Sequence, residues 1–146
     1  MSAGAGELFA PGTFAWMLGI EDTCVYPADG ADARTVLDEH ALTEHDIRQT
    51  SDLRLAAELG ARALRYGVSW PLAHPAPGVF AWETLDAAVA ETERLGLSIV
   101  ADLVHYGTPV WLPGSFADPR YPEAIAEFAA AFAARYAGRV EHITPL

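Results

Sequence analysis

The chain has 146 residues, of which 51% are hydrophobic and 20% are charged. This is the composition of an ordinary globular protein with enough apolar side chains for one core, and it argues against a disordered chain. Nine Lys and Arg residues against twenty Asp and Glu residues give a formal net charge of −11. Because that charge repels phosphate backbones and anionic membrane surfaces, we expect neither nucleic acid nor membrane as a partner.

Signals for export, membrane insertion and disulfide formation are missing from the sequence. Residues 1–9 lack the basic flank and apolar centre of a secretory signal, and no apolar run is long enough to span a bilayer. Cys24 is the single cysteine, so it has no internal disulfide partner, and we interpret it as a small core residue rather than a nucleophile. We expect a cytoplasmic protein.

The first predicted element is a short strand over residues 14–20. This apolar run stops at the acidic pair Glu21 and Asp22, as a buried strand does where it reaches a polar rim. Residues 26–41 are rich in Asp, Ala and Gly without clear periodicity. We interpret them as a long loop, and loops of that length usually have a function.

The first predicted helix covers residues 43–59. Thr43 and Asp46 resemble a capping box with Asp in place of Glu, an apolar stripe follows at helical spacing, and Gly60 ends it. A second strand is predicted over residues 63–68, followed by a loop rich in proline.

The rest of the chain repeats this alternation. A helix over residues 84–95 is closed by Gly96, and residues 97–104 form an apolar run typical of a parallel strand buried on both faces. A third helix begins near residue 122 and extends to about residue 137, and a fourth strand is predicted over residues 140–144.

Strands alternating with helices predict a parallel sheet, as either a doubly wound sheet or a barrel. The doubly wound alternative expects a Gly-x-Gly-x-x-Gly turn after the first strand, and the run from Gly19 to Cys24 does not provide one. Polar and aromatic residues instead follow successive strands, where barrels build their active sites. These residues are Glu21, Asp22, Arg65, Trp70, His105 and Tyr106.

Four segments, in order, resemble family 1 glycoside hydrolases. Residues 65–71, Arg-Tyr-Gly-Val-Ser-Trp-Pro, are similar to the family motif Arg-Phe-Ser-Ile-Ser-Trp-Pro, and residues 52–60 resemble the family's first helix. Residues 104–112 are similar to the segment Tyr-His-Trp-Asp-Leu-Pro-x-Trp-Leu. Residues 139–146 resemble the lead into Thr-x-Asn-Glu-Pro, whose acid/base glutamate would come just after Leu146.

This resemblance implies an α/β fold: the N-terminal half of a (β/α)8 TIM barrel, strands one to four, with residues 1–146 as one partial domain. It implies a retaining β-glycosidase that hydrolyses O-glycosidic bonds in carbohydrate metabolism. In the family the two catalytic carboxylates lie on strands four and seven, and neither position falls within this chain. The chain alone is therefore expected to be inactive. Its partners would be a glycoside substrate and the other half of the barrel, or a self-association partner.

Arg65 and Glu21 are the first two candidate site residues. Arg65 shares a strand face with the small residues Ala63 and Gly67, which leave room for a long cation inside a barrel mouth. By resemblance, Arg65 would hold the nucleophilic carboxylate and keep it ionised. Glu21 stands near the position where the family has a sugar-binding glutamine, and it would face the same mouth and bind hydroxyl groups.

His105 and Tyr106 complete the candidate set. His105 has the same parity as Ala101 and Leu103, which would place it on the inner face at the end of the third strand. The resemblance implies that His105 hydrogen-bonds a hydroxyl group of the sugar. Tyr106 would offer a ring face to the sugar, whereas we interpret Trp111 as a packing residue.

No metal or cofactor is predicted, because the five histidines lack the close spacing of a zinc site and lie in different elements.

Three alternatives stay open. Residues 19–23 resemble a divergent family branch, some members of which are fused to nucleotide-sugar reductase domains. The chain could be a non-catalytic carbohydrate-binding module or barrel-like module of such a protein. It could also be a small α/β protein that dimerises into a ring of eight strands.

Overall fold

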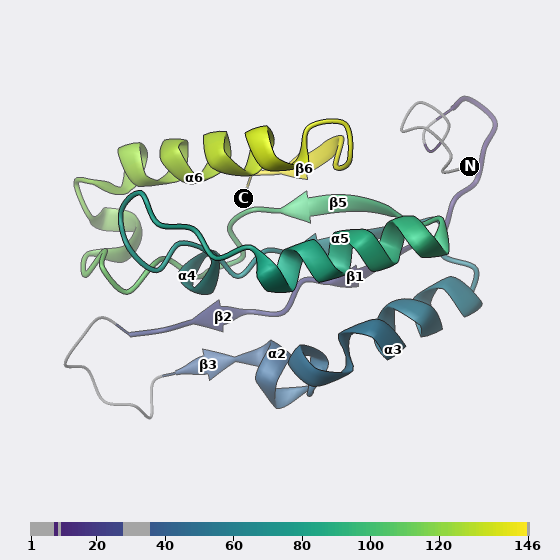
Figure 1. Cartoon of the computed structure of the whole chain (residues 1–146), viewed down its shortest axis with the longest axis horizontal. Coiled ribbons are helices and arrows are strands. Elements are labelled where there is room, and N and C mark those ends of the chain that lie inside the picture. Colours follow the sequence, from purple (N-terminus) through teal and green to yellow (C-terminus); the bar gives the residue numbers. More distant parts are fainter. Residues whose placement is uncertain (1–7, 9, 28–35, 146) are drawn as a thin grey trace.

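The protein is built around a four-stranded parallel sheet, seen in Figure 1. The computed structural model describes residues 8, 10–27 and 36–145. In spatial order the strands are β1 (Met17–Ile20), β4 (Ala63–Gly67), β5 (Ser98–Asp102) and β6 (His142–Thr144). Each neighbouring pair is parallel. The four strands lie side by side in the order in which they occur in the sequence, as the predicted alternation requires.

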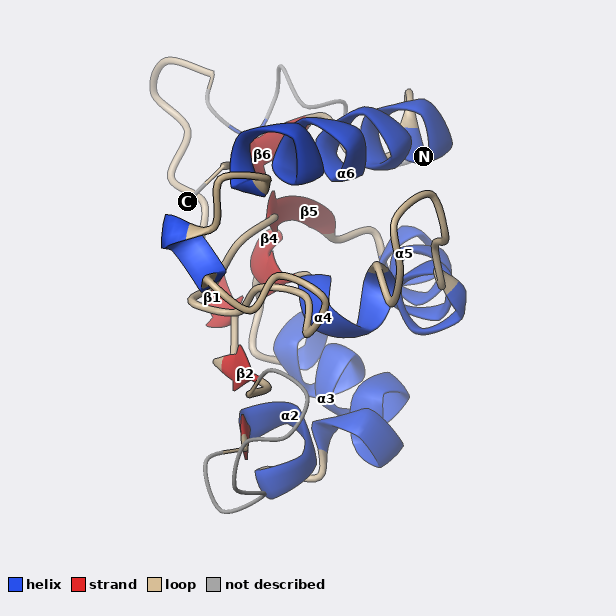
Figure 2. Cartoon of the chain, turned by 90° about the vertical axis from the view of Figure 1, so that its left-hand side faces the viewer, coloured by secondary structure: helices blue, strands red, loops and turns tan. Residues whose placement is uncertain are grey.

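Three long helices connect these strands and lie on one side of the sheet (Figure 2). They are α3 (His45–Glu58), α5 (Glu83–Leu95) and α6 (Tyr121–Tyr136). Helices confined to the outside of a curved parallel sheet are the arrangement of half a (β/α)8 barrel, so the predicted fold class is confirmed. None of the described helices is long and apolar enough to cross a membrane.

The segment expected to be one long loop holds short regular elements. Strands β2 (Cys24–Val25) and β3 (Leu37–Asp38) pair antiparallel, and helix α2 (Glu39–Leu42) follows. Residues 28–35 lie outside the described part. After β4, the proline-rich segment contains the short helix α4 (Trp70–Ala73). A 3-10 turn, η2 (Ser115–Ala117), precedes α6.

The predicted capping box at the start of the first long helix is wrong. The helix begins at His45, and its N-cap is Glu44, at φ 61 and without a side-chain cap. Thr43 is instead the C-cap of α2, and its hydroxyl donates to the carbonyl of Glu39, 2.7 Å away, so it does not cap α3. The Asp46 side chain accepts from the next backbone N–H, a competing local hydrogen bond that short polar side chains favour.

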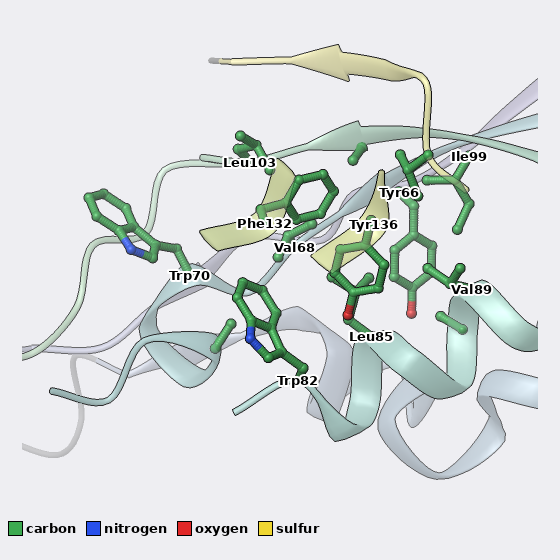
Figure 3. Packing of buried hydrophobic residues seen from close by; sticks show 14 of the residues in the cluster. Tyr66, Val68, Trp70, Trp82, Leu85, Val89, Ile99, Leu103, Phe132 and Tyr136 are labelled. Atoms are coloured by element: carbon green, nitrogen blue, oxygen red, sulfur yellow. The ribbon is translucent and has the colours of Figure 1, made fainter. Parts of the chain in front are cut away.

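The core lies between the sheet and the three helices (Figure 3). Leu64, Tyr66 and Ile99 point from the strands toward the helices and are buried. Aromatic side chains fill the space beside them, with the rings of Trp82 and Phe128 stacked 5.6 Å apart. This continuous apolar layer fixes the face of each strand that points outward, and so also the face that points into the barrel.

The sheet has two open edges in the part of the chain that is described, as half of a barrel must have. Strand β1 pairs only with β4, and β6 pairs only with β5. Half a barrel should leave apolar side chains exposed on the inner face of the sheet, and this holds only in part. Met17 is 48% exposed, but Ala63 and Val100 are buried. Ala63 is small, and Val100 lies in register between Arg65 and His142, whose longer side chains flank it.

Candidate active site

Arg65 is the centre of a charged cluster at the inner face of the sheet. Its Nη1 donates to Oε2 of Glu21 and its Nη2 donates to Oδ2 of Asp102, each at 2.7 Å. Both bonds are charge-assisted, and together they fix the plane of the guanidinium. Arg65 lies on the face opposite Leu64 and Tyr66, so the predicted inward orientation is confirmed.

Glu21 reaches the cluster because the chain leaves β1 in close contact with β4. A Cβ on Gly67 would lie only 1.8 Å from the backbone carbonyl oxygen of Glu21, so any side chain larger than hydrogen would push Glu21 away. The Glu21 side chain is 23% exposed and faces Arg65. The structure therefore places the Glu21 side chain beside Arg65, and its role in binding hydroxyl groups stays a prediction.

Asp102 is the site residue that the sequence analysis missed. It is the last residue of β5, completely buried, and Oδ2 accepts from Arg65 and lies 3.0 Å from Nδ1 of His105. Within the described residues its other oxygen, Oδ1, has no hydrogen-bond partner. The sequence shows Asp102 as the single acid of this strand, but only the register of the sheet, which pairs Asp102 with Gly67, places it on the face of Arg65.

His105 lies in the site, but the parity argument that placed it there is wrong. Ala101 and Leu103 belong to the core on the helix side, so residues of their parity face outward. The strand ends at Asp102, and the chain then turns so that His105 contacts Asp102 three residues earlier. When Nδ1 donates to this carboxylate, Nε2 is left to accept a hydrogen bond from a ligand.

The aromatic residues divide into one exposed ring and two packed ones. Tyr106 is 67% exposed, with its ring edge-to-face on His105 at 4.8 Å, so it is accessible to a ligand. Trp70 is buried and donates to Nδ1 of His74, and Trp111 donates to the carbonyl of His74. The interpretation of Trp111 as a packing residue agrees with these contacts.

Glu21, Asp102 and His105 each present a possible metal-ligand atom, and these atoms lie within 4.8 Å of one another. The guanidinium of Arg65, however, donates to both carboxylates and already supplies the positive charge that they attract. A divalent cation between the carboxylates would be repelled by this fixed charge. The arrangement is therefore suited to polar, hydrogen-bonding ligands rather than to a metal.

Cys24 lies outside the cluster. The thiol is buried, and this burial is the main reason that its pKa rises to about 11. A thiol with so high a pKa carries little thiolate at neutral pH, which supports the interpretation of Cys24 as a core residue.

We predict that Cys24 reacts on the order of 100-fold more slowly with a disulfide reagent than an ordinary thiol of pKa 9.0, because the thiolate is the reacting species. The raised pKa also favours folding below pH 9, and this contribution is lost as the pH rises toward 11. Absorbance of the released reagent measures the rate, with the denatured chain as control. Equal rates in the folded and denatured chains would contradict the prediction.

Comparison with known proteins places these features in context. No model of a known protein family matches the chain. A β-galactosidase from Thermus thermophilus is 34% identical over 110 residues, which are 75% of this chain and 14% of that protein. β-Galactosidase BgaA from Thermus sp is 35% identical over 79 residues, 53% of this chain and 12% of that protein. The chain thus spans a small part of the length of these relatives.

The fold has counterparts among solved structures. A family 1 β-glucosidase from Thermotoga maritima superposes with a TM-score of 0.64 at 21% identity, over 70% of this chain and 24% of that chain. A β-glucosidase from Thermotoga maritima in complex with azafagomine gives the same TM-score and identity, over 70% of this chain and 25% of that chain. The chain resembles the N-terminal portion of a family 1 glycoside hydrolase barrel, as the sequence motifs predicted.

Proposed function

Because the chain resembles the N-terminal portion of family 1 glycoside hydrolases, we propose that it is the N-terminal part of a retaining β-glycosidase that hydrolyses O-glycosidic bonds. The observation that carries the proposal is the position of Arg65. This arginine lies in the matching motif and on the inner face of the half-barrel, where it is held between two carboxylates. The attacking and proton-donating carboxylates would come from outside these 146 residues.

In this proposal the chain supplies the binding half of the site. Arg65 provides positive charge beside an attacking carboxylate and keeps that carboxylate ionised. Glu21 and the free Nε2 of His105 accept hydrogen bonds from sugar hydroxyls, and the exposed ring of Tyr106 packs against a sugar face. Asp102 positions both Arg65 and His105 without touching the sugar, because it is completely buried.

Glu21 and Asp102 do not themselves make a catalytic pair. A retaining glycosidase needs two carboxyl groups about 5 Å apart, one ionised to attack and one protonated to donate. Here both carboxyl groups accept hydrogen bonds from the same guanidinium and are occupied in holding it. Asp102 is also too buried to reach an anomeric carbon. The chain therefore holds no acid and nucleophile of its own at this site.

We predict that the purified 146-residue chain does not hydrolyse aryl β-glucosides or aryl β-galactosides above the rate in buffer, because it lacks both reacting carboxylates. Release of the aryl group measures turnover. The matched experiment uses the same polypeptide extended by the residues that follow in its gene, for which we expect turnover that is lost on replacing Arg65. Robust turnover by the short chain, abolished by Glu21→Gln or Asp102→Asn, would overturn the proposal.

A second candidate function is a non-catalytic carbohydrate-binding module, including one fused to a nucleotide-sugar reductase domain. The observation that favours it is that both terminal nitrogens of Arg65 already donate to carboxylates of this chain. An incoming nucleophile would be a third acid on one guanidinium, and like charges so close oppose one another. Saturable sugar binding by the extended polypeptide without any turnover would favour this function over hydrolysis.

A further inference from the structure

His74 is a completely buried histidine that follows α4 and lies outside the charged cluster at the barrel mouth. Segments that follow two different strands meet at its ring. The chain reaches His74 directly after β4, and Trp111 comes from the segment after β5 that also carries His105. Helix α6 covers another side with Phe128, whose ring is stacked on that of His74 with centroids 6.0 Å apart. His74 therefore joins the rim of the mouth to the helix layer.

The two nitrogens of the His74 ring have different surroundings. Nδ1 accepts a hydrogen bond from the indole N–H of Trp70 at 3.1 Å, and because an indole nitrogen only donates, Nδ1 carries no proton. The proton of the neutral ring is therefore on Nε2, which is buried and makes no hydrogen bond within the described residues. Oε2 of Glu127 lies 3.4 Å from Nε2, without the geometry of a hydrogen bond.

The surroundings of the ring oppose the uptake of a second proton. Phe80 stacks on the ring with centroids 4.6 Å apart, and Trp111 meets it edge-on at 5.0 Å. In the described part of the chain, Glu127 on α6 is the one charged side chain that faces the ring, and it is 43% exposed. Burial is the largest influence on His74 and lowers its pKa, whereas Glu127 raises it. The ring is therefore neutral at neutral pH.

A second proton would break the contact between His74 and Trp70. It would have to bind Nδ1, and two N–H groups would then point at each other across 3.1 Å. Trp70 is only 1% exposed, so its indole cannot turn away without moving the segment that carries it. The charged ring therefore fits only a state in which the two side chains have separated.

We propose that His74 is an acid-sensitive latch: its neutral ring holds the segments after β4 and β5 against α6, and protonation releases them. The latch goes beyond the proposed glycosidase function and does not depend on it, because it shares no residue with the Arg65 cluster.

The direction of the pH dependence follows from proton linkage. The latched state binds the second proton more weakly than the released state, in which the His74 ring has its ordinary pKa of 6.5. The stabilisation of the latched state is therefore complete above pH 6.5 and is lost as the pH falls below that value. Because one proton is involved, the ratio of released to latched molecules rises by about tenfold per pH unit at most.

Acrylamide quenching of tryptophan fluorescence in the full chain measures the release, because Trp70 and Trp111 become accessible when the latch opens. Trp16→Phe is the parent for all measurements, since Trp16 is 63% exposed and would be quenched at every pH. We expect the quenching constant to rise by about twofold or more from pH 7.5 to pH 5, with an unchanged far-UV circular dichroism spectrum. A quenching constant that is the same at both pH values would overturn the inference.

Two variants assign the response to the His74 ring. His74→Gln keeps an acceptor for Trp70 but carries no charge at any pH, so its quenching constant should not change over this range. Glu127→Gln removes the charge that favours the second proton, so the pH midpoint should fall by about 0.3, which corresponds to twofold weaker proton binding. Glu127 is exposed, so this variant should fold even if His74→Gln does not.

Glu123→Gln is the matched control, because Glu123 is exposed on the same helix, and it should leave the midpoint unchanged. A folded His74→Gln variant that responds to acid as its parent does would overturn the latch. A Glu127→Gln midpoint no lower than that of Glu123→Gln would do the same.

Discussion

Replacing Arg65 with methionine is expected to lower the free energy of unfolding by about 3–5 kcal/mol, the usual cost of removing one partner from a buried ion pair. Asp102 is completely buried, and Arg65 is the only full positive charge that it contacts among the described residues. Without the guanidinium, the carboxylate would keep only His105 as a donor among the described residues. Urea denaturation followed by tryptophan fluorescence, at one fixed protein concentration, measures the change.

Two control variants separate this cost from a general loss of packing. Glu21 is partly exposed, so Glu21→Gln should cost no more than about 1 kcal/mol, as for a surface pair. Combining Arg65→Met with Asp102→Leu removes both charges, and apolar replacements of buried pairs are often neutral. The double variant should therefore be more stable than Arg65→Met alone. A loss of under about 1 kcal/mol in Arg65→Met would show that Asp102 is not held as a buried ion.

The order of the elements and the fold could be predicted from the sequence because they depend on local patterns. The apolar runs of β4 and β5, and the helix spacing that ends at Gly96, are visible in a few residues each. Strand order then followed from the preference for adjacent, right-handed crossovers. The inward orientation of Arg65 could also be predicted, because alternate residues of a strand share a face and the small residues Ala63 and Gly67 mark the face of Arg65.

Features that depend on where a strand stops could not be predicted in this way. His105 was placed by counting along a strand, but β5 ends at Asp102, and beyond that point parity has no meaning. The role of Asp102 depends on register between β4 and β5, which brings it beside Arg65 from 37 residues away in sequence. The short helix α2 was also missed, because a single helical turn has no periodicity to reveal it.

The isolated 146-residue chain is expected to self-associate or aggregate. Strands β1 and β6 leave backbone N–H and C=O groups unpaired at the two edges of the described sheet, and such edges template pairing with other chains. Exposed apolar side chains lie around the same edges: Phe14 and Trp16 precede β1, and Ile143 is on β6. Burying one large apolar side chain is worth about 1.5–3 kcal/mol, so a few of them match a domain's net stability of about 5–15 kcal/mol.

Size-exclusion chromatography with light scattering, combined with a thermal melt, measures this association. We expect a dimer or larger species and a broad transition, because half a barrel leaves much of its surface without a partner. Ile143→Lys places a charge on the β6 edge and should shift the chain toward monomer, as edge lysines do in natural sheets. Ile47→Lys is the matched control. Ile47 is 77% exposed and lies on α3, the helix that precedes β4, so the added charge is not on the β6 edge. If the unmodified chain is instead a monomer with a sharp cooperative transition, its open edges are not the liability that their geometry indicates, and the half-barrel is a self-sufficient unit.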